Sequence, residues 1–184
     1  VAVFGLGAVG SFAIEALART GVGNLRLIDF DKVDVSNINR QLFALHSTIG
    51  REKAIIACER VKDINPVCRV ELHSSFINAQ SLEDLLSKDI DVVVDAIDGL
   101  NSKINLIVGA KQLNLAVVSS MGAAGRTDIS MIRTGDISET IVCPLARVVR
   151  QRLHRRGIYK GVRAVYSIEK PLNKQPYKSE DAVD

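Results

Sequence analysis

The chain has few of the residues that build metal sites and disulfide frameworks. Its 184 residues include three cysteines, and no two of them form a C-x-x-C pair. This pattern disfavours a structural zinc site and a disulfide-stapled fold, and it fits a reducing cytoplasm. The three histidines are isolated from one another as well. We therefore expect a cytoplasmic protein without a metal centre built from cysteine or histidine.

Long apolar runs and aromatic residues are also scarce. No run approaches the roughly 18–20 apolar residues that span a bilayer, so no membrane segment is expected in this chain. Aromatic residues make up 4% of the chain and tryptophan is absent, which leaves few side chains on which nucleic-acid bases could stack. The first residue, Val1, already lies in a strand-like run, so we expect an upstream segment to precede it.

Positive charge is concentrated near the C-terminal end. The formal net charge of the chain is +3, but residues 144–178 carry ten Lys/Arg against one acid, a local charge of +9. Residues 1–143 carry 14 Lys/Arg against 17 acids. A basic segment of this kind indicates an anionic partner for the C-terminal part of the protein.

Short apolar strands alternate with helical patterns through most of the chain. The expected strands are residues 1–4, 25–28, 69–72, 92–94, 116–118 and 162–168. The expected helices are residues 8–19, 51–64, 82–86, 104–113 and 144–156. This alternation predicts an α/β fold with a Rossmann-like, mainly parallel sheet and helices on both faces. We expect one domain over residues 1–170 and a flexible tail over residues 171–184.

A glycine motif follows the first predicted strand. Gly5, Gly7 and Gly10 form a G-x-G-x-x-G pattern between that strand and the first helix. Glycines let the backbone approach a phosphate, and the helix N-terminus offers free N–H groups and the positive end of its dipole. Asp29 ends the next strand 19 residues after Gly10, where a carboxylate can bind ribose hydroxyls. The motif predicts a nucleotide site without selecting the nucleotide.

The segment after Asp29 differs from what an NAD-dependent dehydrogenase requires. A long polar stretch runs to Gln41, and a helix begins near Lys53. Arg40 and Lys53 could both reach phosphate oxygens above the glycine turn. The fourth strand ends in Asp95-Ala96-Ile97-Asp98, where a carboxylate could hold Mg²⁺ through oxygen ligands.

Together these motifs resemble the ThiF/MoeB/HesA family, whose adenylation domain also occurs in ubiquitin-activating enzymes. The resemblance covers about residues 1–125 and implies a ThiF-type adenylation domain, a homodimer, and the use of ATP and Mg²⁺. In such a domain a substrate carboxylate attacks the α-phosphate of ATP and pyrophosphate leaves. The resemblance implies catalytic roles for Arg40, Lys53 and Asp98, with Asp98 also binding the metal. The nucleotide-binding residues that it implies are Gly5, Gly7, Gly10, Asp29, Asp31, Asn37, Arg40, Gln41, Lys53 and Asp98.

Departures from the family pattern indicate a branch. Members that activate sulfur-carrier proteins usually have paired C-x-x-C zinc sites, which this chain lacks, and Gly99 stands where many members have Asn. Residues 119–169 resemble the tRNA threonylcarbamoyladenosine dehydratase branch, which implies tRNA as partner and a cyclising loss of water. The alternative is adenylation of a ubiquitin-like or sulfur-carrier protein, so a carrier or sulfur-transfer protein is a second candidate partner. A third is a nucleotide-binding module without adenylation, such as an NAD sensor.

The predicted helix over residues 144–156 has an apolar stripe and a basic surface. The stripe consists of Leu145, Val148, Val149 and Leu153. The candidate RNA-binding residues are Arg147, Arg150, Arg155 and Arg156. RNA phosphate binding, a solvated face and a subunit contact are all compatible with this pattern. Cys143, just before the helix, is either a small buried capping residue or a thiol of lowered pKa.

Overall fold

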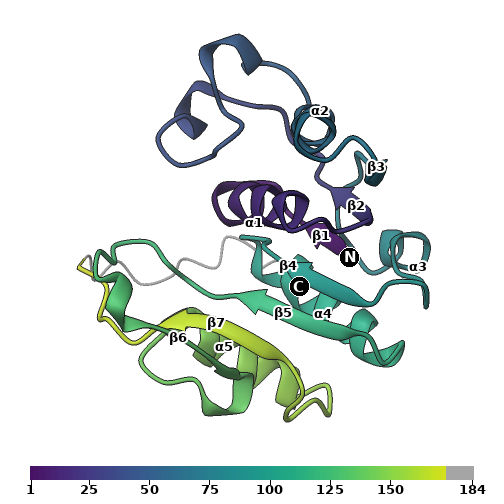
Figure 1. The fold of residues 1–184 in the computed structure, drawn as a ribbon. Coiled ribbons are helices and arrows are strands. Elements are labelled where there is room, and N and C mark those ends of the chain that lie inside the picture. Colours follow the sequence, from purple (N-terminus) through teal and green to yellow (C-terminus); the bar gives the residue numbers. More distant parts are fainter. Residues whose placement is uncertain (173–184) are drawn as a thin grey trace.

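The computed structural model describes residues 1–172, and within them seven strands form one sheet (Figure 1). The strand order is β3-β2-β1-β4-β5-β7-β6. The strands are β1 (Ala2–Phe4), β2 (Asn24–Ile28), β3 (Arg69–His73), β4 (Val92–Asp95), β5 (Ala116–Ser120), β6 (Ile132–Asp136) and β7 (Arg163–Ser167). Every neighbouring pair is parallel except β6 with β7, which is antiparallel. The predicted Rossmann-like, mainly parallel sheet is confirmed.

Helices cover both faces of this sheet, as expected. They are α1 (Ala8–Arg19), α2 (Lys53–Ile64), α3 (Ser81–Leu85), α4 (Leu100–Gln112) and α5 (Pro144–His154). Helices α1 and α2 bury one cluster of apolar side chains against β1 and β2, in which Ile14 meets Val3 and Leu27. Helices α3, α4 and α5 bury a second cluster on the other face, in which Ile107 and Val149 are fully buried. Side chains alternate between the two clusters along each strand because successive residues point to opposite faces.

One half of the first face has no helix over it within residues 1–172. In Figure 1, α1 and α2 lie over the β3–β1 side, whereas β5, β7 and β6 are bare on that face. Strand register places Val118, Val165 and Ile132 there, and Ile132 is 50% exposed. We call this surface the open face. No helix among the described residues is long and apolar enough to pass through a membrane.

Two elements differ from the sequence prediction. Strand β6 lies in a polar stretch where no strand was expected, and its sequence of Ile-Arg-Thr-Gly-Asp ends in two residues that are depleted in strands. Five paired positions with β7 hold it, so tertiary pairing overrides the local preference. Helix α4 begins at Leu100, earlier than the predicted residue 104, because Asn101, Ser102 and Lys103 hid the helical pattern. Most of the predicted tail, residues 173–184, lies outside the described residues.

Candidate active site

The glycine turn, residues 5–10, packs tightly between the ends of β1 and β4. Gly5 has a φ of +86°, which L side chains rarely adopt, and a Cβ there would lie 2.7 Å from the carbonyl oxygen of Ala96. At Gly10 an added Cβ would lie 1.8 Å from the carbonyl oxygen of Gly5. Both positions therefore require glycine. The turn brings the start of α1 against the loop that leads from β4 to Asp98.

The N-terminus of α1 is prepared for an anion. Its N-cap is Gly7, which provides no side-chain acceptor, and its first turn contains no acidic residue. The first backbone N–H groups of a helix lack partners within it, and the helix dipole places partial positive charge there. A Cβ on Gly7 would have a single neighbour within 4 Å, the Gln41 amide nitrogen at 3.6 Å. The space above Gly7 is thus open on a side bordered by Gln41.

Asp29 joins the glycine turn to the end of β2. The side chain is buried, its Oδ2 accepts a hydrogen bond from the Leu6 N–H at 2.7 Å, and its Oδ1 accepts one from the Asp31 N–H at 2.8 Å. Burial raises the pKa of Asp29, while these two hydrogen bonds act in the opposite direction. The carboxylate is therefore held in one orientation at the carboxyl ends of β1 and β2.

Lys53 and Asp31 form an ion pair at the same edge. The Lys53 Nζ lies 2.8 Å from the Asp31 Oδ2, and the Lys53 N–H donates to the Asp31 carbonyl oxygen at 3.0 Å. The Lys53 side chain is 7% exposed, whereas that of Asp31 is 47% exposed. A buried ammonium group with a half-exposed carboxylate as its partner can exchange that partner for another anion at little geometric cost.

Asn37 and Arg40 are engaged within their own segment. The buried Asn37 side chain accepts a hydrogen bond from the Asp34 N–H at 3.1 Å, which caps the short 3₁₀ turn Val35–Asn37. The exposed Arg40 guanidinium donates to the Ser36 carbonyl oxygen and to the Asn39 Oδ1, both at 2.8 Å. The structure therefore links the predicted residues in a chain around the glycine turn: Asp29 bonds to Leu6 within the turn and to Asp31, Asp31 pairs with Lys53, and Gln41 borders Gly7. Asn37 and Arg40 are linked to that group through the 34–41 segment.

The two carboxylates of the β4 motif have different environments. Asp95 is fully buried, where its Oδ2 accepts hydrogen bonds from the Lys103 Nζ at 2.8 Å and the Ser119 Oγ at 2.5 Å. Its Oδ1 accepts from the Ile97 N–H at 3.1 Å. Asp98 lies beyond the strand end and is exposed. Asp98 is thus the carboxylate of this motif that a ligand can approach.

Lys103 is a buried residue of this site that was not predicted from the sequence. Its side chain is completely buried, and its Nζ also donates to the Ser120 carbonyl oxygen at 3.0 Å. The lysine lies three residues after Leu100 and four before Ile107, on the apolar face of α4. A lysine on the apolar face of a predicted helix could have indicated a buried ion pair with a carboxylate.

The donor set fits magnesium bound together with phosphates. No group of three or more His, Cys, Asp or Glu within residues 1–172 is arranged to hold a metal ion by itself. Mg²⁺ commonly takes one or two protein carboxylates and completes its shell with phosphate oxygens and water. Asp98, at the edge that carries the glycine turn, satisfies that requirement.

The four candidate RNA-binding arginines, two on α5 and two just after its end at His154, divide into two groups. The apolar stripe is confirmed, since Leu145, Val149 and Leu153 are buried. Arg150 points into the protein, where it donates to the Thr140 carbonyl oxygen at 2.8 Å and to the Thr140 Oγ1 at 2.6 Å. The exposed members are Arg147, Arg155 and Arg156. Because α5 leads into the start of β7, Arg155 and Arg156 lie at the sheet edge opposite the glycine turn.

Cys143 is a buried residue at the start of α5. It is 3% exposed and belongs to the core cluster beneath α4 and α5. This burial supports the interpretation of Cys143 as a small packing residue that precedes Pro144, the first residue of the helix.

Comparison with known proteins places this site in a family. The chain is 45% identical over 172 residues to the tRNA threonylcarbamoyladenosine dehydratase of Bacillus subtilis, an alignment that covers 94% of this chain and 68% of that protein. It is 41% identical to the Haemophilus influenzae protein of the same name, over 96% of this chain and 68% of that one. The crystal structure of E. coli tRNA N6-threonylcarbamoyladenosine dehydratase, TcdA, in complex with ATP superposes with a TM-score of 0.88 at 38% identity, over 94% of this chain and 74% of that chain. The chain spans about two thirds of the length of these curated relatives. The ThiF family model matches residues 1–167, so this chain belongs to the ThiF family.

Proposed function

We propose that this protein activates a carboxylate with ATP, and that the carboxylate belongs to threonylcarbamoyladenosine in tRNA. The observation that carries the proposal is the glycine turn, fixed by Asp29 and pressed against the β4 loop, on a fold shared with a dehydratase that binds ATP. The identity of 41–45% to proteins named for this dehydration extends over nearly the whole chain. We assign the activity to residues 1–170 as one adenylation domain.

The residues at the strand ends would each bind one part of ATP. The glycine turn and the α1 N-terminus bind the phosphates, and Asp29 binds the ribose hydroxyls. Lys53 turns from Asp31 to a phosphate oxygen, since both acceptors are anionic oxygens. The residues that line the remaining surface are Asn37, Arg40 and Gln41. Asp98 would hold Mg²⁺, and the ion would neutralise phosphate charge there.

The reaction brings two anions together. An oxygen of the threonine carboxylate attacks the α-phosphorus of ATP, the bond to the bridging oxygen breaks, and pyrophosphate leaves. A nucleophilic atom of the same modified nucleoside then attacks the activated carbonyl carbon, and AMP leaves with the former carboxylate oxygen. The product is a ring that is lighter than the substrate by one water. Lys53 and Arg40 lower the barrier by stabilising the charge that develops on the phosphates.

We also propose that the protein works as a homodimer in which a second copy covers the open face. Ile132 is 50% exposed there, and Phe12 and Val9 on α1 are 56% and 42% exposed. Large apolar side chains that are this exposed are candidates for an interaction surface. Light scattering on the purified protein should give twice the chain mass. The free cysteines and the proposed tRNA substrate support a cytoplasmic location.

The experiment that tests the function measures the product nucleoside. The full-length enzyme is incubated with ATP·Mg²⁺ and tRNA bearing threonylcarbamoyladenosine, and the RNA is then digested and its nucleosides are weighed. We expect a nucleoside lighter by one water and one pyrophosphate for each. An unchanged nucleoside from enzyme that still binds ATP would refute the proposal. AMP attached to the terminal glycine of a carrier protein would support the alternative.

A further inference from the structure

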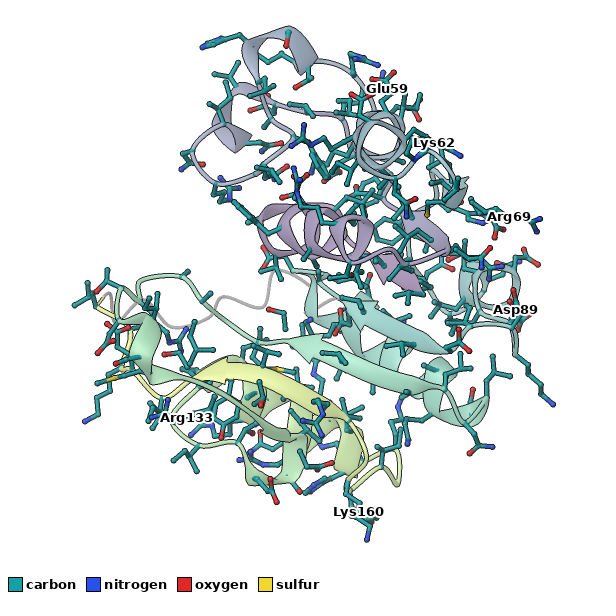
Figure 2. All side chains as sticks on the ribbon, in the orientation of Figure 1. Glu59, Lys62, Arg69, Asp89, Arg133 and Lys160 are labelled. Atoms are coloured by element: carbon teal, nitrogen blue, oxygen red, sulfur yellow. The ribbon has the colours of Figure 1, made fainter. Side chains whose placement is uncertain are left out.

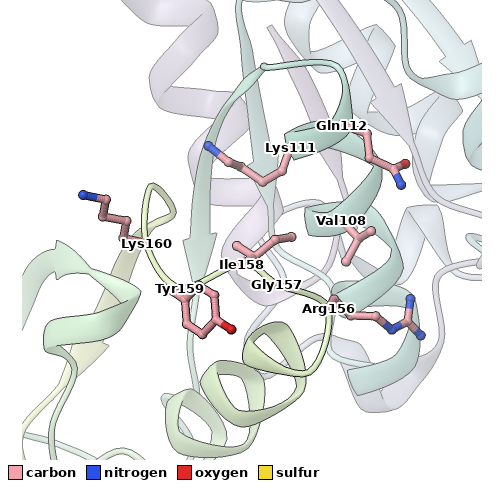
Figure 3. Close-up of a pocket in the computed structure, with 8 residues that line it drawn as sticks. All are labelled: Val108, Lys111, Gln112, Arg156, Gly157, Ile158, Tyr159 and Lys160. Carbon is pink, nitrogen blue, oxygen red and sulfur yellow. The ribbon is translucent and has the colours of Figure 1, made fainter.

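A cavity lies at the amino-end edge of the sheet, opposite the glycine turn. It has a volume of about 450 Å³ and opens between the end of α4 and the loop that joins α5 to β7 (Figure 3). The residues that line it are Val108, Lys111, Gln112, Arg156, Gly157, Ile158, Tyr159 and Lys160. We call this cavity the α4–β7 pocket. The lining set contains three cations and no acid.

The cations surround an apolar floor. In Figure 3 the amino groups of Lys111 and Lys160 point to one side, the Arg156 guanidinium points to the other, and Ile158 lies between them. Lys111 is anchored by a hydrogen bond from its Nζ to the Gly161 carbonyl oxygen at 3.2 Å, which leaves two N–H donors for a ligand. Lys160 projects from the lower edge of the molecule (Figure 2). Separated cations above an apolar floor fit an extended ligand with several negative charges.

Tyr159 adds an aromatic surface to this pocket. Its side chain is 63% exposed, and its ring packs against His154 with centroids 5.1 Å apart and planes inclined by 45°. The contact with His154 restricts the ring without covering it. An exposed aromatic ring beside cations is the arrangement on which unpaired bases stack while their phosphates bind Lys and Arg.

We propose that the α4–β7 pocket binds a nucleotide unit of the tRNA, with phosphates on Arg156 and Lys160 and a base on Tyr159. This inference rests on the proposed function, which makes tRNA the substrate. The described part of the basic segment that contains this loop, residues 144–172, carries eight Lys/Arg against one acid, a local charge of +7. The acid beside the loop is Asp136, whose Oδ2 accepts a hydrogen bond from the Gly161 N–H at 2.6 Å. An aromatic ring among cations favours RNA over an acidic peptide, which has no base to stack.

The pocket is too far from the adenylation site for one nucleotide to reach both. Helix α4 begins at Leu100, two residues after Asp98, and ends at Gln112 in the pocket wall. Thirteen helical residues cover about 20 Å at 1.5 Å each. A tRNA arm that presents its modified base to Asp98 can extend over this distance. The pocket therefore contributes to capture of the RNA and leaves ATP binding unaffected.

Three single substitutions and one matched control test the proposal. Tyr159→Ala, Arg156→Ala and Lys160→Ala change the pocket, and Arg69→Ala removes an exposed cation at β3, the opposite end of the strand order. Loss of the stacking ring should weaken tRNA binding on the order of ten-fold. Loss of each cation should lower the slope of log affinity against log salt by about one. The KM for tRNA should rise in each pocket variant, while the kcat at saturating tRNA and the affinity for ATP stay at wild-type values. Arg69→Ala should behave as wild type.

Filter binding with unmodified tRNA measures the affinity of the pocket for RNA independently of turnover. If the enzyme dehydrates the nucleoside but all three variants keep the wild-type tRNA affinity and salt slope, the pocket assignment is refuted and the proposed function stands. Enzyme that binds tRNA through the pocket and forms no dehydrated nucleoside would refute the proposed function alone. Calorimetry with ATP covers a third case. Two bound equivalents in the wild type and one in Tyr159→Ala would make the pocket a free-nucleotide site and overturn the RNA assignment.

Discussion

Replacing Lys103 with methionine removes the cation that faces Asp95 inside the protein. Both side chains are 0% exposed, and the Nζ and Oδ2 are 2.8 Å apart. Removing one member of such a pair leaves a buried charge with hydrogen bonds from Ser119 and Ile97 but no counter-ion, which costs about 3–5 kcal/mol. Unfolding free energies are usually about 5–15 kcal/mol, so we expect a large loss in urea midpoint at fixed protein concentration. ATP binding should weaken too, because the loop that Asp95 orders contacts Gly5.

A second variant separates loss of charge balance from loss of packing. Combining Lys103→Met with Asp95→Asn removes both charges, and the amide oxygen can still accept the hydrogen bond from the Ile97 N–H. The double variant should therefore be more stable than Lys103→Met alone. As a control, Lys88→Met changes an exposed lysine and should shift the free energy of unfolding by no more than about 0.5 kcal/mol. A Lys103→Met protein within about 1 kcal/mol of wild type would refute the argument that this ion pair holds the β4 loop.

Four other changes test the site and its surroundings. Gly10→Ala should abolish ATP binding in calorimetry, because its Cβ would fall 1.8 Å from the Gly5 carbonyl oxygen; normal ATP affinity would mean that the turn is not as tight as described. Lys53→Ala should lower the rate of pyrophosphate release by about 2–4 kcal/mol of transition-state stabilisation, and a rate within a factor of three of wild type would exclude this role. Asp98→Asn should abolish turnover with an unchanged circular dichroism spectrum, whereas near-normal turnover would remove Asp98 from the metal site. Hydrogen bonds and charge from Arg60 and Arg19 lower the pKa of Glu15 to about 2, so its contribution to stability is present above the usual pKa of about 4.5 and is lost as pH falls from there toward 2. Glu15→Gln should flatten the loss of stability over that range, and an unchanged pH profile would contradict this assignment.

The edge of the sheet that carries the glycine turn could be predicted because its determinants are local. Gly5 and Gly10 occupy positions in the turn where a side chain would clash with the backbone. Asp29 is the first residue after β2, and the parallel register of β1 and β2 brings its carboxylate to the Leu6 N–H. Strand alternation and flanking helices then specify a parallel sheet whose carboxyl ends form the site. The roles of Arg40 and Lys53 in catalysis stay predictions, although the structure does place Lys53 beside Asp31.

What escaped prediction depends on contacts between residues far apart in the chain. Strand β6 exists because β7, about thirty residues later, supplies its hydrogen-bond partners. Arg150 resembles its neighbours in sequence, yet it points inward because the 137–140 turn presents Thr140 to its guanidinium. The α4–β7 pocket similarly joins Lys111 to Tyr159 across 48 positions, which no spacing rule connects.

The sequence by itself determined the family pattern, the parallel sheet and the position of the glycine turn at the carboxyl ends of the strands, since each follows from short-range glycine chemistry and hydrophobic periodicity. The tertiary structure alone decided how deeply each carboxylate of the β4 motif is buried. Asp95 is buried because α4 packs against the sheet and Lys103 on that helix forms an ion pair with it. Asp98 lies beyond the strand end and is exposed. This difference in burial depends on the packing of a helix against a strand. A buried charge is tolerated where a group of opposite charge is buried in contact with it.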